Sequence, residues 1–180
     1  MIRTDSDAVS PVIGVMLMLV VVIIIAAVVS AFAGGLSGSQ ERSPIITLRG
    51  TFSQSDGLTI EHSGGDAIAT ATTNVMVRPS RTFGSAEHMV WIVNKSSITN
   101  ANGDESSQWI RTDGRTGTKH FAGGDIAYVL PPYHEYQYLQ PGASASFRFS
   151  NPDWIGRTFW LELVDDSGRV FARTEVTIQP

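Results

Sequence analysis

The chain contains no cysteine among its 180 residues, so neither disulfide bonds nor cysteine-ligated metal sites are available to it. It also lacks an excess of basic residues. Lys and Arg number 13 against 17 Asp and Glu, and the formal net charge at pH 7 is −4. Proteins that bind nucleic acid through its phosphates present a basic surface. We therefore expect no nucleic-acid partner, and a folded domain that depends on its own core rather than on disulfide bonds.

Histidines are few and show no compact spacing. No pair is placed at i, i+4 as in a zinc-binding helix; the four are His62, His88, His120 and His134. The sequence Gly64-Gly65-Asp66 follows His62 closely, so we expect that imidazole to bond a turn backbone rather than a metal. The sequence also has no phosphate-binding loop and no nucleophile elbow. It therefore predicts no enzyme, no metal and no cofactor.

One short run alternates oxygen-bearing side chains in the manner of a calcium loop. Its members are Asn100, Asn102 and Asp104. However, Gly103 stands at the wrong position, and the twelfth residue, which should be a bidentate glutamate, is Arg111. We therefore interpret this run as a solvated turn.

Charge is missing entirely between Asp7 and Glu41, where Val, Ile, Leu, Met and Ala dominate. A bilayer core needs about 20 apolar residues at about 1.5 Å each, so this run predicts a membrane-spanning helix. Pro11 is tolerated in the first helical turn, and Gly34-Gly35 is a natural stop. We expect a helix over residues 9–35 that contacts membrane lipid.

Small residues recur four apart within this run and would let two helices approach closely. The candidate packing positions are Ala26, Ala27, Ser30 and Ala31. Membrane helices are often rich in small residues, so the spacing also has a neutral interpretation.

An ordinary secretory signal is the alternative interpretation of this segment. Ala31-Phe32-Ala33 has the A-x-A form of a cleavage site, which would make Gly34 the first mature residue. Against it, Arg3 is offset by Asp5 and Asp7, so the start is hardly basic. The apolar core is also longer than the about 7–15 residues of a secretory signal.

Residues 36–44 are rich in Gly, Ser and Pro and predict a linker, after which the pattern changes to period two. Alternating apolar residues predict half-buried strands within 45–180. They lie around Ile46–Phe52, Leu58–Ile60, Ala67–Arg78, His88–Val93, Asp125–Leu130, Phe147–Phe149, Phe159–Leu163 and Val170–Ile178. Asp165-Asp166-Ser167-Gly168 predicts a hairpin turn between the last two. The fold class is therefore α+β: one long N-terminal hydrophobic helix followed by a single all-β, sandwich-like domain.

Two further segments are candidates for surface functions. Asn94-Lys95-Ser96 is an N-glycosylation sequon, which makes Asn94 a candidate acceptor in an exported protein. Tyr133, Tyr136 and Tyr138 surround His134 in a proline-flanked segment. That segment predicts either loop packing or an aromatic contact surface.

The N-terminus resembles that of archaeal type IV pilins. The matching residues are Ala8 and Val9, followed by the recognition motif Ser10, Pro11, Val12, Ile13 and Gly14 and then Val15-Met16-Leu17-Met18. By this resemblance, residues 1–8 are a leader that a prepilin peptidase removes by cutting between Ala8 and Val9. The helix then stays in the mature protein. Bacterial pilins carry a glutamate at the position where this chain has Ile13. The absence of that glutamate follows the archaeal pattern.

A second, weaker resemblance to the same family lies in the β region. It rests on Glu61-His62-Ser63-Gly64-Gly65-Asp66-Ala67-Ile68, on Gly124-Asp125, on Pro141-Gly142 and on the hairpin at 163–170. Residues 81–121 are unmatched, and we expect this chain to differ from its relatives there.

The resemblance implies a structural subunit of an adhesive surface pilus. Its partners would be other pilin subunits, the prepilin peptidase, the pilus assembly machinery and, before assembly, lipid. The helix would cross the cell membrane once with the β domain outside. The alternative is a monomeric, membrane-anchored surface protein that binds a ligand or partner through its β domain.

Overall fold

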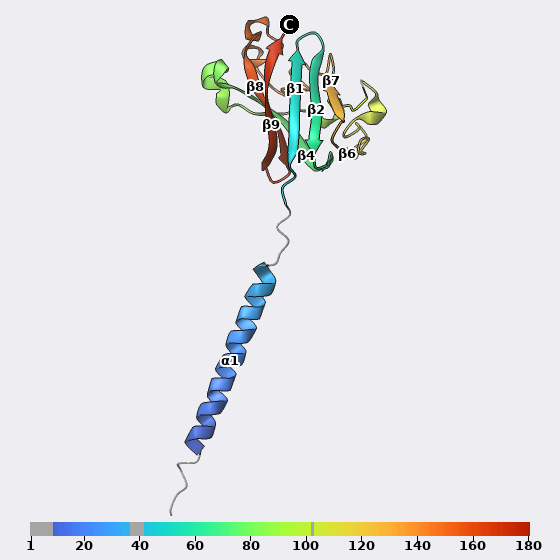
Figure 1. The fold of residues 1–180 in the computed structure, drawn as a ribbon. Helices are drawn as coiled ribbons and strands as arrows, with labels where there is room; N and C mark the ends of the chain where they lie inside the picture. The colour runs from blue at the N-terminus through green and yellow to red at the C-terminus, as the bar shows by residue number, and fades with distance from the viewer. Residues whose placement is uncertain (1–8, 37–41, 102) are drawn as a thin grey trace, which may run out of the picture. The chain divides into compact units, whose positions relative to one another are not determined.

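The computed structural model describes residues 9–36, 42–101 and 103–180. It divides into two compact units, residues 1–42 and 43–180. Within these described ranges, the first unit contains one long helix and the second contains the strands (Figure 1). The predicted α+β class is confirmed.

Helix α1 spans Val9–Leu36 and is apolar on every side. Val20 to Ile25 are β-branched throughout, which lowers helix propensity in water. In lipid the balance changes, because every backbone group must find its hydrogen bond within the segment. The sequence is thus suited to a helix in an apolar medium.

The second unit, here called the β domain, is built from one curled sheet with the strand order β5-β4-β8-β9-β1-β2-β7, plus a two-stranded sheet β3-β6 (Figure 1). Its strands are β1 (Ile46–Ser53), β2 (Gly57–Gly65), β3 (Ile68–Ala69), β4 (Thr73–Pro79), β5 (Trp91–Ile92), β6 (His120–Phe121), β7 (Ile126–Val129), β8 (Thr158–Asp165) and β9 (Val170–Gln179). Five 3₁₀ helices connect them within the described residues: η1 (Arg81–His88), η2 (Lys95–Ser97), η3 (Glu105–Ser107), η4 (Ala145–Phe147) and η5 (Pro152–Trp154).

The large sheet consists of two antiparallel blocks, β5-β4-β8-β9 and β1-β2-β7. They join through a short parallel pairing of β1 with β9, in which Phe52 lies opposite Ile178 and Ser53 opposite Gln179. Both blocks contribute buried side chains to one hydrophobic core. At its centre, the Phe149 and Phe159 rings stack with centroids 4.4 Å apart, and Phe52 meets Phe159 edge-on at 5.7 Å.

The alternation predicted most of this core. Phe159, Leu161 and Leu163 of β8 are buried, and so are Val176 and Ile178 of β9. The predicted β8–β9 hairpin is confirmed. At its turn the amide of Gly168 donates to the carbonyl of Asp165 at 2.9 Å.

The predicted strand at Phe147–Phe149 is wrong. Phe147 ends η4, and Phe149 lies in a turn, although its ring is fully buried. Gln140 takes the place of a neighbouring strand: its Nε2 donates to the carbonyl of Phe147 at 2.8 Å, and its Oε1 accepts from the amide of Phe149 at 2.6 Å. A side chain thus satisfies the backbone groups that a sheet would otherwise pair.

Two other predicted strands are shorter than expected. A turn divides Ala67–Arg78 into β3 and all of β4 except Pro79; in this turn the amide of Thr70 donates to the carbonyl of Lys119 at 3.1 Å. Only Trp91 and Ile92 of the segment His88–Val93 form a strand, and His88 is the last residue of η1. Sequence alternation does not separate these short elements.

Candidate functional site

The first candidate site is the surface of α1. From Val12 to Ala33 the helix is long and apolar enough, by length and composition, to cross a membrane. Its 22 residues extend about 33 Å at 1.5 Å per residue, against about 30 Å for a bilayer core. Every residue in that span is exposed, and its large apolar side chains range from Val21 at 44% to Met18 at 71%. The helix therefore offers an apolar surface on all sides.

The predicted recognition motif lies in the first turns of this helix. α1 begins at Val9, the residue that follows the predicted cleavage point, whereas Ala8 lies outside the described residues. The side chains of Ser10 and Pro11 are also outside them, and those of Val12 and Ile13 are exposed at 59% and 54%.

Gly14 is not explained by the fold of the chain. A Cβ added there would meet nothing within 4 Å in the described structure. Glycine inside a helix costs about 1 kcal/mol relative to alanine in water, and nothing in the described structure requires glycine at this position.

The predicted packing residues Ala26, Ala27, Ser30 and Ala31 all lie on α1 with their side chains exposed. Residues four apart lie on the same face of a helix. Ala26 and Ser30 therefore form one narrow stripe, and Ala27 and Ala31 form the next.

The two glycine-aspartate motifs of the β domain meet in space, which the sequence did not reveal. The amide of Gly124 donates to the carbonyl of His62 at 2.7 Å, and the amide of His62 donates to the carbonyl of Asp125 at 3.0 Å. The Asp125 carboxylate in turn accepts from the amide of Ala122 at 2.8 Å. These bonds join the end of β2 to the turn before β7.

His62 performs the structural role that the sequence predicted. Its side chain is fully buried, and Nε2 lies 3.0 Å from the carbonyl oxygen of Asp66. Asp66 also bonds the chain where it enters the β domain: its carboxylate accepts from the amide of Ile45 at 3.0 Å, and its amide donates to the carbonyl of Ile45 at 2.9 Å. A side chain at Gly65 would collide with that carbonyl, so this position requires glycine.

The remaining polar candidates take part in local structure. Asp104 caps η3: its carboxylate accepts from the amide and the hydroxyl of Ser106, and these bonds lower the pKa of Asp104. Asn100 Oδ1 accepts from the indole N–H of Trp109 at 2.8 Å. Asn102 lies outside the described residues. Across the part of the chain that the structure describes, no three His, Asp or Glu side chains are grouped as a metal site would need.

The tyrosine segment packs on itself and on the domain. The rings of Tyr133 and Tyr138 meet edge-on at 5.1 Å, and the guanidinium of Arg148 lies 3.5 Å from the centroid of Tyr136. His134 is half-buried, and desolvation lowers its pKa. These contacts fit the loop-packing interpretation.

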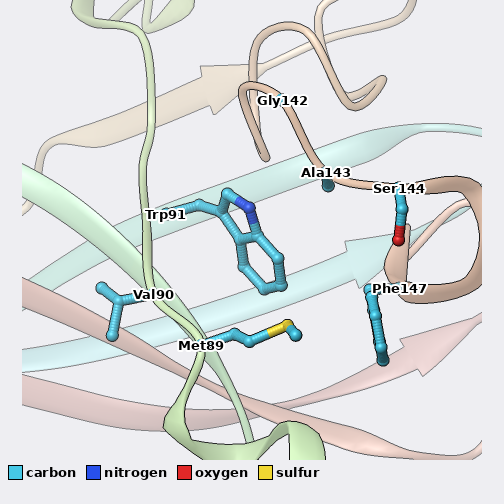
Figure 2. Close-up of a pocket in the computed structure, with 7 residues that line it drawn as sticks. All are labelled: Met89, Val90, Trp91, Gly142, Ala143, Ser144 and Phe147. Atoms are coloured by element: carbon cyan, nitrogen blue, oxygen red, sulfur yellow. The ribbon is translucent and has the colours of Figure 1, made fainter.

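An apolar groove of about 380 Å³ lies between the residues after η1 and the segment that leads into η4. Figure 2 shows the side chains of Met89, Trp91 and Phe147 gathered around it, with Ser144 at one end. No local sequence pattern predicts this groove, because its two walls, Met89–Trp91 and Gly142–Phe147, lie far apart along the chain.

The sequon at Asn94 adopts a compact, exposed turn. Asn94 is the N-cap of η2: its Oδ1 accepts from the Ser96 amide at 3.1 Å and from the Ser96 hydroxyl at 2.9 Å. Because Oδ1 is engaged by two donors, the amide nitrogen Nδ2 is directed away from them. Within the described residues, Nδ2 makes no hydrogen bond.

Comparison with known proteins connects the N-terminal helix to a family. Residues 7–48 match the family model described as the N-terminal region of archaeal type IV pilins. None of the curated proteins matches the chain. The matched region contains the motif at Ser10–Gly14, the whole of α1 and the start of β1. The N-terminal region of this chain is thus similar to that of archaeal type IV pilins.

Proposed function

We propose that this chain is the structural subunit of an adhesive surface pilus, assembled through α1. The observation that carries the proposal is a helix of membrane-spanning length whose side chains are apolar and exposed around the whole circumference. Such a surface is stable in lipid or against other apolar helices, and not in water. The family match over residues 7–48 supports packing against other apolar helices as well as contact with lipid.

Processing comes first in this proposal. A prepilin peptidase cuts between Ala8 and Val9, on the cytoplasmic side of the membrane, and α1 stays in the mature chain. The match of residues 7–48 to the N-terminal region of archaeal type IV pilins supports this order. The β domain lies outside the cell, and residues 36–44 link it to the helix.

Assembly then replaces lipid contacts by helix contacts. Lipid tails are as apolar as leucine, so association in the membrane depends on close packing rather than on the hydrophobic effect. The stripes of Ala26 with Ser30 and Ala27 with Ala31 supply the close approach. The pilus assembly machinery and further copies of this chain are the partners.

The mature N-terminus tests the processing step. Mass spectrometry of the exported protein should show Val9 as its first residue. A chain that starts at Gly34 would support secretory cleavage, and an intact Met1 would mean that no cleavage occurs. Replacing Ala8 by a bulky residue should leave the unprocessed chain in the membrane, whereas Ala8→Gly should be processed.

Electron microscopy of sheared surface fibres tests the assembly step. The processed chain should be a component of these fibres. Its absence from them, with normal processing, would contradict the filament proposal. It would favour the alternative, a monomeric anchored protein that binds a partner through the groove at Met89, Trp91 and Phe147. In the pilus, that same groove is the candidate surface for adhesion.

Modification of Asn94 completes the proposal. The bond would form between Nδ2 of Asn94 and the anomeric carbon of a sugar, while the bond from that carbon to the phosphate of an activated glycosyl donor breaks. The phosphate leaves with the electron pair, and one amide proton passes to a base. The exposed turn and the engaged Oδ1 support this assignment.

A further inference from the structure

A second groove lies directly beside the sequon, and Asn94 is one of its lining residues. The volume of this Asn94 groove is about 530 Å³, within the range of about 300–1,000 Å³ that small-molecule sites occupy. Its other walls include Ile92, Lys95 and Ile110, and also Arg111, Gln137 and Pro141. These residues come from three separate parts of the chain.

Backbone hydrogen bonds fix these parts around Asn94. The amide of Asn94 donates to the carbonyl of Tyr138 at 2.9 Å, which holds the segment containing Gln137. The amide of Ile110 donates to the carbonyl of Lys95 at 3.4 Å, which holds Arg111 alongside η2. The groove is therefore held in place next to the acceptor residue by the fold itself.

The lining combines apolar side chains with polar side chains, and its charged groups are positive. Ile92 is 53% exposed, and Ile110 and Pro141 add further apolar surface. Among the described residues that line the groove, Lys95 and Arg111 are cationic and none carries a carboxylate. Lys95 donates to the carbonyl of Ala71 at 2.7 Å. In the described part of the chain, the side chains of Arg111 and Gln137 make no hydrogen bond.

A sugar ring matches this lining. Its C–H faces are apolar, and its edges carry hydroxyl or carboxylate groups that accept from guanidinium and amide donors. We propose that the Asn94 groove seats the first sugars of a glycan attached to Asn94, with Ile92 against a ring face and Arg111 and Gln137 bonded to its edge. This inference rests on the proposed modification of Asn94. It adds that the glycan is held against the domain rather than free in solvent.

Native-state trypsin cleavage of the full-length glycosylated chain tests this seat. Arg111 and Arg115 lie in one exposed loop, where the amide of Arg111 bonds the carbonyl of Arg115 at 2.8 Å, and Arg115 does not line the groove. Local opening of the loop exposes the peptide bonds after Arg111 and Arg115 alike. The ratio of the two cleavage rates therefore reports how accessible the Arg111 side chain is to trypsin. We expect the glycan to slow cleavage after Arg111 about fivefold relative to Arg115, the factor of one ordinary hydrogen bond. The unglycosylated comparison is Ser96→Ala, which keeps Asn94.

Two further measurements separate the outcomes. Glycopeptide mass spectrometry reports whether Asn94 is occupied, and an empty Asn94 would overturn both the modification and the seat. An occupied Asn94 with an unchanged cleavage ratio would overturn the seat alone. Gln137→Ala and Ile92→Ser should restore cleavage after Arg111 without changing occupancy. If they leave the protection intact, the glycan shields Arg111 merely by being tethered nearby, and the seat is again refuted.

Discussion

Replacing Gly50 by alanine should destabilise the β domain, because side chains of β8 and β9 lie close against the backbone of β1 at this residue. A Cβ at Gly50 would lie 2.7 Å from Cγ2 of Val176 and 2.9 Å from Cδ2 of Leu161. Both distances are shorter than real Cβ contacts. The two neighbours are 1% and 0% exposed, so neither can move away into solvent.

The magnitude follows from two opposing effects. Overpacking a filled core costs about 1–3 kcal/mol, and two contacts below 3.0 Å place Gly50→Ala in the upper part of that range. Alanine recovers about 0.5–1 kcal/mol, because glycine loses more conformational freedom in a strand. We therefore expect a net loss of about 1–2 kcal/mol in the free energy of unfolding.

Urea unfolding of residues 43–180, monitored by tryptophan fluorescence, measures this loss in the free energy of unfolding. The matched control is Gly123→Ala, where a Cβ would meet its nearest neighbour at 3.4 Å and the backbone needs no left-handed conformation. That control should be neutral or slightly stabilising. In a double-mutant cycle, Val176→Ala should reduce the cost of Gly50→Ala by removing the closest methyl group. A neutral Gly50→Ala with an unchanged m-value would refute the close packing of Val176 and Leu161 against Gly50.

Three further predictions follow from the same structure. Leu161→Ala, at a fully buried position, should cost about 2–5 kcal/mol in urea unfolding, whereas the exposed Thr177→Ala should cost little. The pKa of Asp165 is lowered to about 2, first by the Ser167 hydroxyl and then by the amide of Arg169. Its charged form thus stabilises the hairpin above about pH 4, and this contribution is lost as the pH falls toward 2; Ser167→Ala should raise this pKa in an NMR titration. Replacing both Ala27 and Ala31 by Leu should leave insertion and processing unchanged but weaken helix association by about 1–3 kcal/mol. Normal fibre counts in this double variant would show that the stripe is not a packing face.

The helix and the central strands could be predicted from the sequence, because their signals are local and repeated. A stretch without charge from Val9 to Leu36 admits little besides an apolar helix. The alternation in β8 and β9 records which face is buried at almost every step.

The connecting segments could not be predicted in the same way. Three residues suffice for a 3₁₀ helix such as η2 or η3, which is too short to show a period. Phe149 is as buried as a strand residue, yet Gln140 supplies its hydrogen bond. The pairing of Gly124 with His62, and the grooves at Trp91 and Asn94, depend on residues that only the folded chain brings together.

The uniformly apolar surface of α1 affects what determines the rotation of the helix about its own axis. An amphipathic helix has a preferred direction to face, and turning it about its axis exposes the wrong side chains. Turning α1 about its axis exchanges one apolar side chain for another, so the solvation free energy in the surrounding medium favours no particular rotation. Only the shape of the helix surface can then favour one rotation about the axis over another. That shape is set by the positions where alanine, serine and glycine replace larger residues. A single added methyl group at such a place could therefore redirect the helix without making it any less apolar.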